Sequence, residues 1–319
     1  MPHLIQRVTI AGPLWRTHFA CRAETLLGAY LALLVASAAW AQEFPAVTVE
    51  TVVKDAHYAE GPVWSPDGFL LFSDTTIDRI QKLTPGKGES EYASLPGGAA
   101  GMAYDDQGRL YVCEFRARRV TRTGKNGKTD VIAAQFEGKR LNAPSDIVVR
   151  RDGNVYFTDP AFGNQQDSRE LDFYGVYRVK PGGIPEAVAR WKTRPNGIAV
   201  SPNGRLLYVA DSDARLIRVY DLAGNGSASN ERVFVDKIEG VPAGLRTDAK
   251  GNVFVAAKYV YIYSPKGEML REIQLSQTPS NLAFGDPDFT SLYVTARTAV
   301  YRVRAGGLKG APPYAPQVP

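Results

Sequence analysis

Six short segments of the chain carry polar or small side chains at one recurring place, just before an apolar run. Glu60 supplies a carboxylate there and Asn196 supplies an amide oxygen. A ring of one carboxylate and several neutral oxygens suits a hard divalent cation such as calcium. The competing interpretation is that Glu60 and Asn196 only cap turns. The segments are Glu60-Gly61-Pro62, Ala99-Ala100-Gly101, Pro144-Ser145-Asp146, Pro195-Asn196-Gly197, Pro242-Ala243-Gly244 and Pro279-Ser280-Asn281.

Histidine and cysteine are too scarce for several common kinds of site. Of the three histidines, only His57 lies outside an N-terminal segment that we expect to be removed. This excludes a multi-histidine zinc site in the mature chain, and a Ser-His-Asp triad could use only His57. His57 precedes Glu60 by three residues, where it is either a catalytic acid or base or a surface-loop histidine. Cys21 leaves with the N-terminal segment, so Cys113 has no disulfide partner within the chain.

The polar segments belong to a larger repeat. Each copy is a short apolar strand, a glycine turn with Asp or Asn nearby, and a second apolar strand, which is the pattern of a β-hairpin. A sixth copy has an altered turn at Asp286-Pro287-Asp288-Phe289. The spacings of the other five are 40, 45, 51 and 47 residues, between the turn glycines Gly68, Gly108, Gly153, Gly204 and Gly251.

Two further strand-like runs follow each hairpin, such as Leu216-Ile217-Arg218-Val219-Tyr220. Four strands per repeat and six repeats predict an all-β fold, a six-bladed β-propeller over residues 42–304. The six polar segments would then meet at one mouth of the central channel, and we call them the channel turns. Residues 47–53 form a strand with no blade of its own, so we expect this strand to close the ring by joining the last blade. Residues 305–319, rich in Pro and Gly, are expected to be disordered.

Residues 1–41 have the features of a signal peptide. Arginines precede an uncharged apolar stretch, and Ala39-Trp40-Ala41 offers small residues for cleavage after Ala41. A membrane anchor is the alternative, although the stretch is short for a span of about 20 residues. Cleavage predicts a periplasmic or secreted protein with no membrane attachment afterwards.

The overall charge gives no support for nucleic-acid binding. The 319 residues carry a formal charge of +5, and the chain has no Lys/Arg run. The charge expected after signal removal is smaller still, so a basic surface for phosphates is not predicted. We expect a monomer that acts on a small molecule.

Several motifs together resemble the family of senescence marker protein (regucalcin), gluconolactonase and luciferin-regenerating enzyme, on its bacterial gluconolactonase branch. The resemblance covers essentially all of residues 47–304. It implies a six-bladed propeller whose channel holds one divalent cation, used by many members to hydrolyse sugar lactones. Calcium is the cation expected first, with zinc or manganese as alternatives. The motifs are Glu60-Gly61-Pro62-Val63-Trp64, Arg140-Leu141-Asn142-Ala143-Pro144-Ser145-Asp146, Phe157-Thr158-Asp159-Pro160, Pro195-Asn196-Gly197 and Asn281-Leu282-Ala283-Phe284-Gly285.

The resemblance also implies roles for single residues. Glu60 matches the first metal ligand and Asn196 the central asparagine ligand. Arg140 and Asn142 fall in the motif that borders the substrate pocket, and Ser145 stands where members usually have an asparagine facing metal or substrate. These positions make Arg140, Asn142 and Ser145 the expected substrate-binding residues.

One departure from the family pattern bears directly on the chemistry. Members usually have Pro-Asp-Gly where this chain has Pro242-Ala243-Gly244, and that aspartate is both a ligand and the expected base. Glu60 alone would leave one charge of a divalent cation uncompensated, which is costly in a partly dry channel. Asp146 is the nearest replacement ligand, although strand alternation turns it away from the side of Ser145. The base would then be His57 or Glu60.

Two functions from different classes remain. The first is a hydrolase of sugar lactones or related esters that uses a channel cation. The second is a metal-poor propeller that binds a small molecule or a protein without hydrolysis, as in strictosidine synthase-like uses of this fold. Ser145 and Ala243 favour the second.

Overall fold

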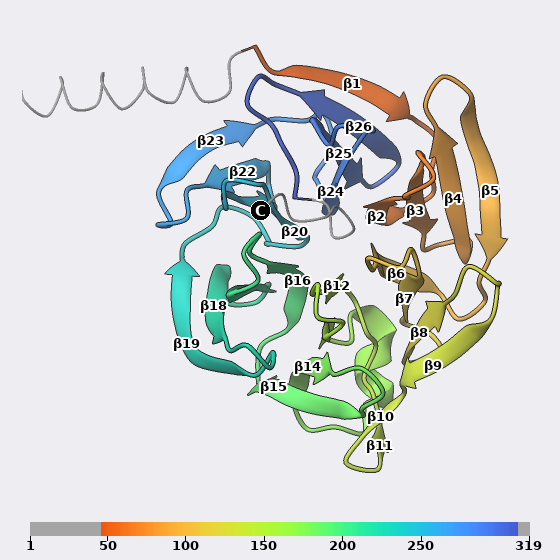
Figure 1. The fold of residues 1–319 in the computed structure, drawn as a ribbon, viewed down its shortest axis with the longest axis vertical. Helices are drawn as coiled ribbons and strands as arrows, with labels where there is room; N and C mark the ends of the chain where they lie inside the picture. Colours follow the sequence, from red (N-terminus) through yellow and green to blue (C-terminus); the bar gives the residue numbers. More distant parts are fainter. Residues whose placement is uncertain (1–45, 312–319) are drawn as a thin grey trace, which may run out of the picture. The chain divides into compact units, whose positions relative to one another are not determined.

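The computed structural model describes residues 46–311 and shows six four-stranded antiparallel sheets arranged around a channel (Figure 1). The predicted signal peptide and residues 312–319 lie outside the described residues. Blade one consists of β2 (Ala59–Trp64), β3 (Leu70–Asp74), β4 (Arg79–Thr84) and β5 (Gly88–Ser94). Blade two consists of β6 (Ala99–Tyr104), β7 (Leu110–Glu114), β8 (Arg119–Thr123) and β9 (Thr129–Ala133). Blade three consists of β12 (Ile147–Val149), β13 (Val155–Asp159), β14 (Tyr174–Val179) and β15 (Pro185–Trp191).

Blades four to six follow the same order from the channel outwards. Blade four consists of β16 (Pro195–Val200), β17 (Leu206–Asp211), β18 (Leu216–Leu222) and β19 (Ala228–Val235). Blade five consists of β20 (Leu245–Thr247), β21 (Val253–Ala256), β22 (Val260–Tyr263) and β23 (Met269–Ile273). Blade six consists of β24 (Asn281–Gly285), β25 (Ser291–Ala296), β26 (Ala299–Arg304) and β1 (Thr48–Val53). The prediction of six blades is confirmed.

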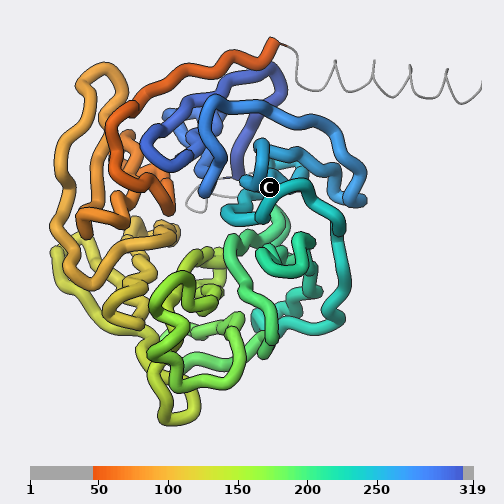
Figure 2. Tube along the Cα trace, turned by 180° about the vertical axis from the view of Figure 1, so that it is seen from behind, coloured from red at the N-terminus to blue at the C-terminus, as the bar shows by residue number. Residues whose placement is uncertain are grey.

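The N-terminal strand closes the ring as expected. β1 pairs antiparallel with β26, with Val49 opposite Val303, so the outer strand of the last blade comes from the start of the propeller (Figure 2). Val53 is 2% exposed and packs in a cluster with Phe72 and Tyr293. This closure removes the open edge that the last sheet would otherwise present.

The burial of each strand explains why these sequences take these places. β3, β7, β13 and β21 are buried along their whole length, which accounts for their apolar runs. β3, β7 and β13 each end in a buried acidic residue. The outer strands β1, β5 and β19 are mostly exposed and carry charged residues. The core therefore lies between neighbouring blades, where apolar residues of one sheet pack on the next.

Two small elements fall outside the blades. The β10 (Gln135–Phe136) and β11 (Lys139–Arg140) hairpin lies at the periphery of blade three, and a 3-10 helix spans Gly163–Ser168 (Figure 1). No helix within residues 46–311 has the length and apolar character needed to cross a membrane. Residues 305–311, assigned to the tail by the sequence analysis, hold a placed segment in which Gly310 bridges to Asp248 and Leu308 is 3% exposed.

Hydrogen bonds pass from blade to blade at the channel turns and complete a circle, which we call the inter-blade ring. Each link joins an amide or hydroxyl of one blade to a main-chain carbonyl oxygen of the next. The links are Ser73 Oγ to Ala100 O (3.0 Å), Gly101 N to Ser145 O (2.7 Å), Thr158 Oγ1 to Asn196 O (2.6 Å), Gly197 N to Ala243 O (2.9 Å), Gly244 N to Ser280 O (2.9 Å) and Ser280 Oγ to Ala59 O (2.9 Å).

The glycines of the channel turns are required by this close approach. A Cβ atom on Gly61 would lie 1.9 Å from the carbonyl oxygen of Ala100, and one on Gly197 would lie 2.1 Å from that of Ala243. Neither contact is sterically possible, because real Cβ atoms do not approach a backbone oxygen so closely. Glycine therefore allows neighbouring inner strands to touch, and this contact brings the channel turns together.

We predict that Gly197→Ala lowers the free energy of unfolding by about 2 kcal/mol or more, because the added methyl overlaps the neighbouring backbone. Gly224→Ala is the matched control: a Cβ there meets nothing within 4 Å, so its effect should stay within about 0.5 kcal/mol. Urea unfolding followed by circular dichroism measures both. Equal stabilities for the two variants would contradict the tight inter-blade ring.

Candidate active site at one channel mouth

Glu60 provides a carboxyl group with an unusual proton affinity at this mouth. Its Oε2 accepts a hydrogen bond from the amide of Gly61 at 3.0 Å. Burial and, to a smaller extent, the nearby charge of Asp146 raise the pKa of Glu60 from 4.5 to about 7. The Gly61 amide and the side chains of Asn281 and Ser280 partly offset this rise. Glu60 therefore exchanges its proton near neutral pH.

A chain of hydrogen bonds orients the amide of Asn196. Its Nδ2 donates to Ser212 Oγ at 3.1 Å, and Ser212 in turn donates to the carbonyl oxygen of Pro242 at 2.8 Å. The Oδ1 atom accepts from Ser145 Oγ at 3.4 Å. The structure thus brings Ser145 and Asn196 together, as the sequence analysis expected for two neighbouring channel turns. Their oxygens form a neutral, polar part of the site.

Asp146 has other partners than the expected cation. It is 1% exposed, and its Oδ2 accepts hydrogen bonds from the Ile198 amide at 3.1 Å and from Arg246 Nη1 at 3.3 Å. Its Oδ1 has no hydrogen-bond partner in the described part of the chain. The pairing with Arg246 compensates the charge of Asp146, so Glu60 remains the carboxylate available to a ligand.

The oxygen donors present fit a hard divalent cation in kind but are short of charge. Glu60, Asn196 and Ser145 offer one carboxylate, one amide oxygen and one hydroxyl, whereas Ala243 offers only its main chain, with its amide bound to Ala256 O and its carbonyl to Gly197 N. Within residues 46–311, no group of three or more His, Cys, Asp or Glu side chains is placed to hold a metal ion. Calcium affinity rises with ligand charge, so these residues suit a weakly held cation.

His57 is fixed by a buried acid. Its amide donates to Asp74 Oδ2 at 2.8 Å, its Nδ1 lies 3.2 Å from the same oxygen, and its side chain is 58% exposed. Asp159 holds the amides of Asn142 and Ala143 in the same way, each at 2.7 Å. Asp74 and Asp159, which end the second strands of their blades, therefore bind turn amides. No hydrogen bond among the described residues joins His57 to Glu60.

The structure differs from the sequence analysis at two substrate-binding positions. Asn142 is fully buried, and its Nδ2 donates to the carbonyl oxygens of Asp159 and Phe173, so its side chain holds a loop and does not face the channel. Arg140 ends the β10–β11 hairpin at the periphery, where its main chain binds Glu170 (Figure 1). The family motif alone did not reveal that this segment leaves the channel before returning at Pro144.

Other residues near Glu60 are not among the catalytic, substrate-binding or metal-binding residues predicted from the sequence. Ser280 and Asn281 belong to the sixth channel turn and interact with the Glu60 carboxyl. Tyr58 is 43% exposed, and its pKa is raised by burial and by the charge of Glu60, while Arg297 counteracts this rise. Ser280 and Asn281 occupy the same segment of the repeat as Glu60, and this position could have identified them as site residues.

Comparison with known proteins now decides the family. The model of the SMP-30/gluconolactonase/LRE-like region matches residues 58–298. The chain belongs to this family. Gluconolactonase of Zymomonas mobilis is 33% identical over 288 residues, covering 80% of this chain and 81% of that protein. Pentonolactonase XacC of Haloferax volcanii is 26% identical, covering 78% and 85%. The structure of a gluconolactonase from Xanthomonas campestris superposes with a TM-score of 0.78 at 29% identity, covering 84% and 92%.

The side chains at three channel turns decide what the mouth of this SMP-30/gluconolactonase/LRE-like family member offers a ligand. This member keeps a carboxylate at Glu60 and an amide at Asn196, and it has a methyl group at Ala243. Its mouth therefore depends on one carboxyl group whose pKa is close to neutral.

We predict that the unfolding free energy of the native chain falls, relative to that of Glu60→Gln, as the pH rises from about 5 to about 8. The folded pKa of about 7 lies above the usual 4.5, so the folded state holds a proton that the unfolded state releases in this window. The expected relative loss is on the order of 1 to 3 kcal/mol. Asp159, whose pKa burial also raises to about 7, is present in both proteins and cancels. Urea titrations at both pH values measure the difference, and a pH-independent difference would refute the assigned environment of Glu60.

Proposed function

We propose that the protein hydrolyses sugar lactones or related esters, with Glu60 as the general base. Membership of the family and the names of the gluconolactonase and pentonolactonase relatives support this reaction class. The observation that carries the proposal is the pKa of about 7 at Glu60. A base with a pKa near the working pH is deprotonated in useful amounts and still accepts a proton efficiently.

The step requires few groups. A water oxygen attacks the lactone carbonyl carbon while its proton passes to a carboxylate oxygen of Glu60. The carbon–oxygen bond of the ring then breaks, and the same carboxyl returns the proton to the departing ring oxygen. The product is the open hydroxy acid. His57 is the less suitable base, because its Nδ1 faces Asp74 and no contact links it to Glu60.

A divalent cation, calcium before zinc or manganese, would be held by Glu60 and Asn196 and would polarise the lactone carbonyl. The chain's own residues account for recognition. Ser145 Oγ and Asn196 Oδ1 form a hydrogen-bonding pair that suits substrate hydroxyl groups. Tyr58 lies near Glu60, and Arg297 lies near Tyr58, so a phenol and a guanidinium at this mouth can bind oxygens of a polar substrate.

The alternative is a propeller that binds a small molecule or a protein at the same mouth without hydrolysis. The methyl group of Ala243 and the charge shortage that it leaves favour this alternative. Binding without turnover of every tested lactone would support it over hydrolysis. On the basis of the signal-like residues 1–41, we place either activity in the periplasm or outside the cell, which N-terminal sequencing of the mature protein tests.

We predict that Glu60→Gln lowers lactone hydrolysis at about pH 8 by 100-fold or more, since a positioned base contributes about 10² to 10⁴-fold. Without an added cation the native rate should rise with pH around the Glu60 pKa of about 7, and a cation bound to Glu60 should move this rise to lower pH. The measurement is proton release from a panel of aldonolactones with calcium, zinc or manganese added. Glu239→Gln is the control, because Glu239 is an exposed glutamate paired with Lys258. Equal activity of Glu60→Gln and the native protein would end this proposal.

We predict that Ala243→Asp strengthens calcium binding at least tenfold, because a second carboxylate balances the cation charge. Isothermal titration of native and variant proteins measures the affinity. Ala249→Asp is the control for added negative charge, since Ala249 follows Asp248 at the other end of β20. An equal gain in both variants would show that Ala243 does not face a cation site.

A further inference from the structure

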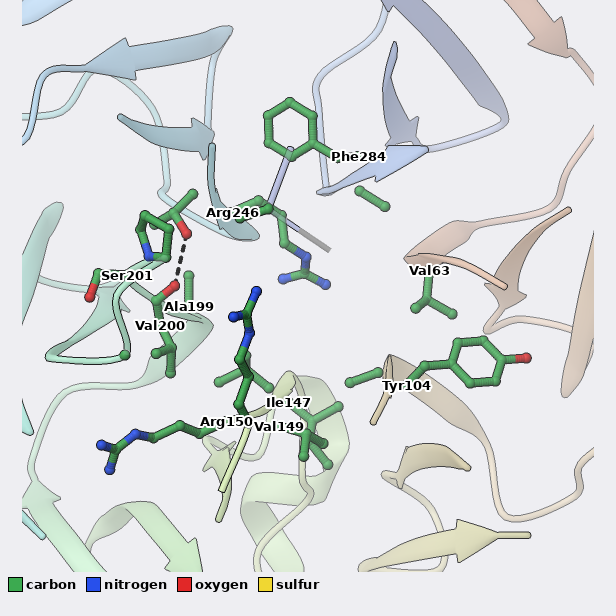
Figure 3. Close-up of a pocket in the computed structure, with 18 of the residues that line it drawn as sticks. Val63, Tyr104, Ile147, Val149, Arg150, Ala199, Val200, Ser201, Arg246 and Phe284 are labelled. Atoms are coloured by element: carbon green, nitrogen blue, oxygen red, sulfur yellow. Dashed lines mark hydrogen bonds between the residues drawn. The ribbon is translucent and has the colours of Figure 1, made fainter. Parts of the chain in front are cut away.

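The opposite end of the channel contains a cavity of about 330 Å³. Glu60 is the second residue of β2, whereas Val63 and Trp64, which line the cavity, are its last two. The cavity and the Glu60 site therefore lie at opposite ends of the inner strands. Its walls are largely apolar, and Figure 3 shows side chains from several blades directed into it. A cavity of this size accommodates a small organic molecule. The apolar lining includes Val63, Ile147, Val149, Val200 and Phe284.

Arg246 places its guanidinium in this cavity (Figure 3). Its Nη1 donates to the Leu245 carbonyl oxygen at 2.6 Å and to Asp146 Oδ2 at 3.3 Å. Its Nε and Nη2, with three N–H groups between them, have no hydrogen-bond partner in the part of the chain that the structure describes. The side chain is only 19% exposed. Donors held among apolar walls favour a ligand that brings acceptors to them.

The remaining charges at the cavity also favour an anion. Arg150 is already paired with Asp152 at 3.2 Å and donates to the Ala223 carbonyl oxygen. Arg151 also lines the cavity and has no ion pair among residues 46–311. Arg246 is paired with Asp146, as Arg150 is with Asp152. Arg151 therefore leaves one excess positive charge at the cavity.

We propose that this cavity binds a small organic anion whose carboxylate pairs with Arg246 and whose apolar body packs against Val63, Ile147 and Phe284. A guanidinium offers parallel N–H donors that match the two oxygens of a carboxylate. An apolar ligand body would cover the apolar walls and remove them from water, whereas an inorganic anion would leave them hydrated. This site uses the other end of the channel and does not depend on lactone hydrolysis.

Titration calorimetry with sodium benzoate tests the proposal on the full-length protein. One benzoate should bind per chain, and benzamide, which has the same shape without the charge, should bind at least tenfold more weakly. Arg246→Gln should weaken benzoate binding at least tenfold. Arg232→Gln, which changes an outer-strand arginine paired with Asp221, should leave it unchanged.

A second variant separates loss of the site from loss of folding. Val63→Phe fills the cavity and keeps Arg246, so it should abolish benzoate binding while the melting temperature remains close to that of the native protein. Three results would overturn the proposal: no benzoate binding by the native protein, native affinity in both Arg246→Gln and Val63→Phe, or equal affinities for benzoate and benzamide.

Discussion

The inter-blade ring is the constraint on which the rest of the structure depends. Each blade binds the next through a backbone carbonyl oxygen, and the last link returns from Ser280 to Ala59. Contacts this close leave no room for a side chain at Gly61 or Gly197. They also bring residues far apart in sequence to one mouth, where Ser145 meets Asn196 across 51 positions. The chemistry of the site is thus a consequence of how tightly the blades approach one another.

Within this ring the carboxyl group of Glu60 is surrounded by neutral oxygens and amides. Burial raises its pKa because the charged form loses hydration, and the nearby Asp146 carboxylate adds repulsion. A second acid at position 243 would make the mouth a stronger cation site. With alanine there, the same carboxyl has to serve both as the charge that attracts a cation and as the base. Because one carboxyl group has to fill both roles, this site is compatible with either lactone hydrolysis or ligand binding without hydrolysis.

The sequence repeat predicted the number and order of the blades, whereas it did not predict the side-chain contacts between blades. Spaced turn glycines and apolar runs indicated six blades, and the unpaired segment before the first hairpin indicated the closing strand β1. Asn142 and Arg140 were assigned by motif, yet their segment includes a peripheral hairpin that no periodicity marks. The pairing of Asp146 with Arg246 spans 100 positions and two blades, so no local pattern could predict it.

The desolvated carboxyl group of Glu60 is central to the chemistry of this mouth, and its proton equilibrium can be measured directly. Carbon-13 labelling of glutamate side chains, with Glu60→Gln to assign the signal, gives the titration curve of this carboxyl by NMR. We expect a midpoint near 7, well above the usual glutamate pKa of 4.5. A midpoint close to 4.5 would show that Glu60 is fully hydrated, and the mouth described here would then lack its base.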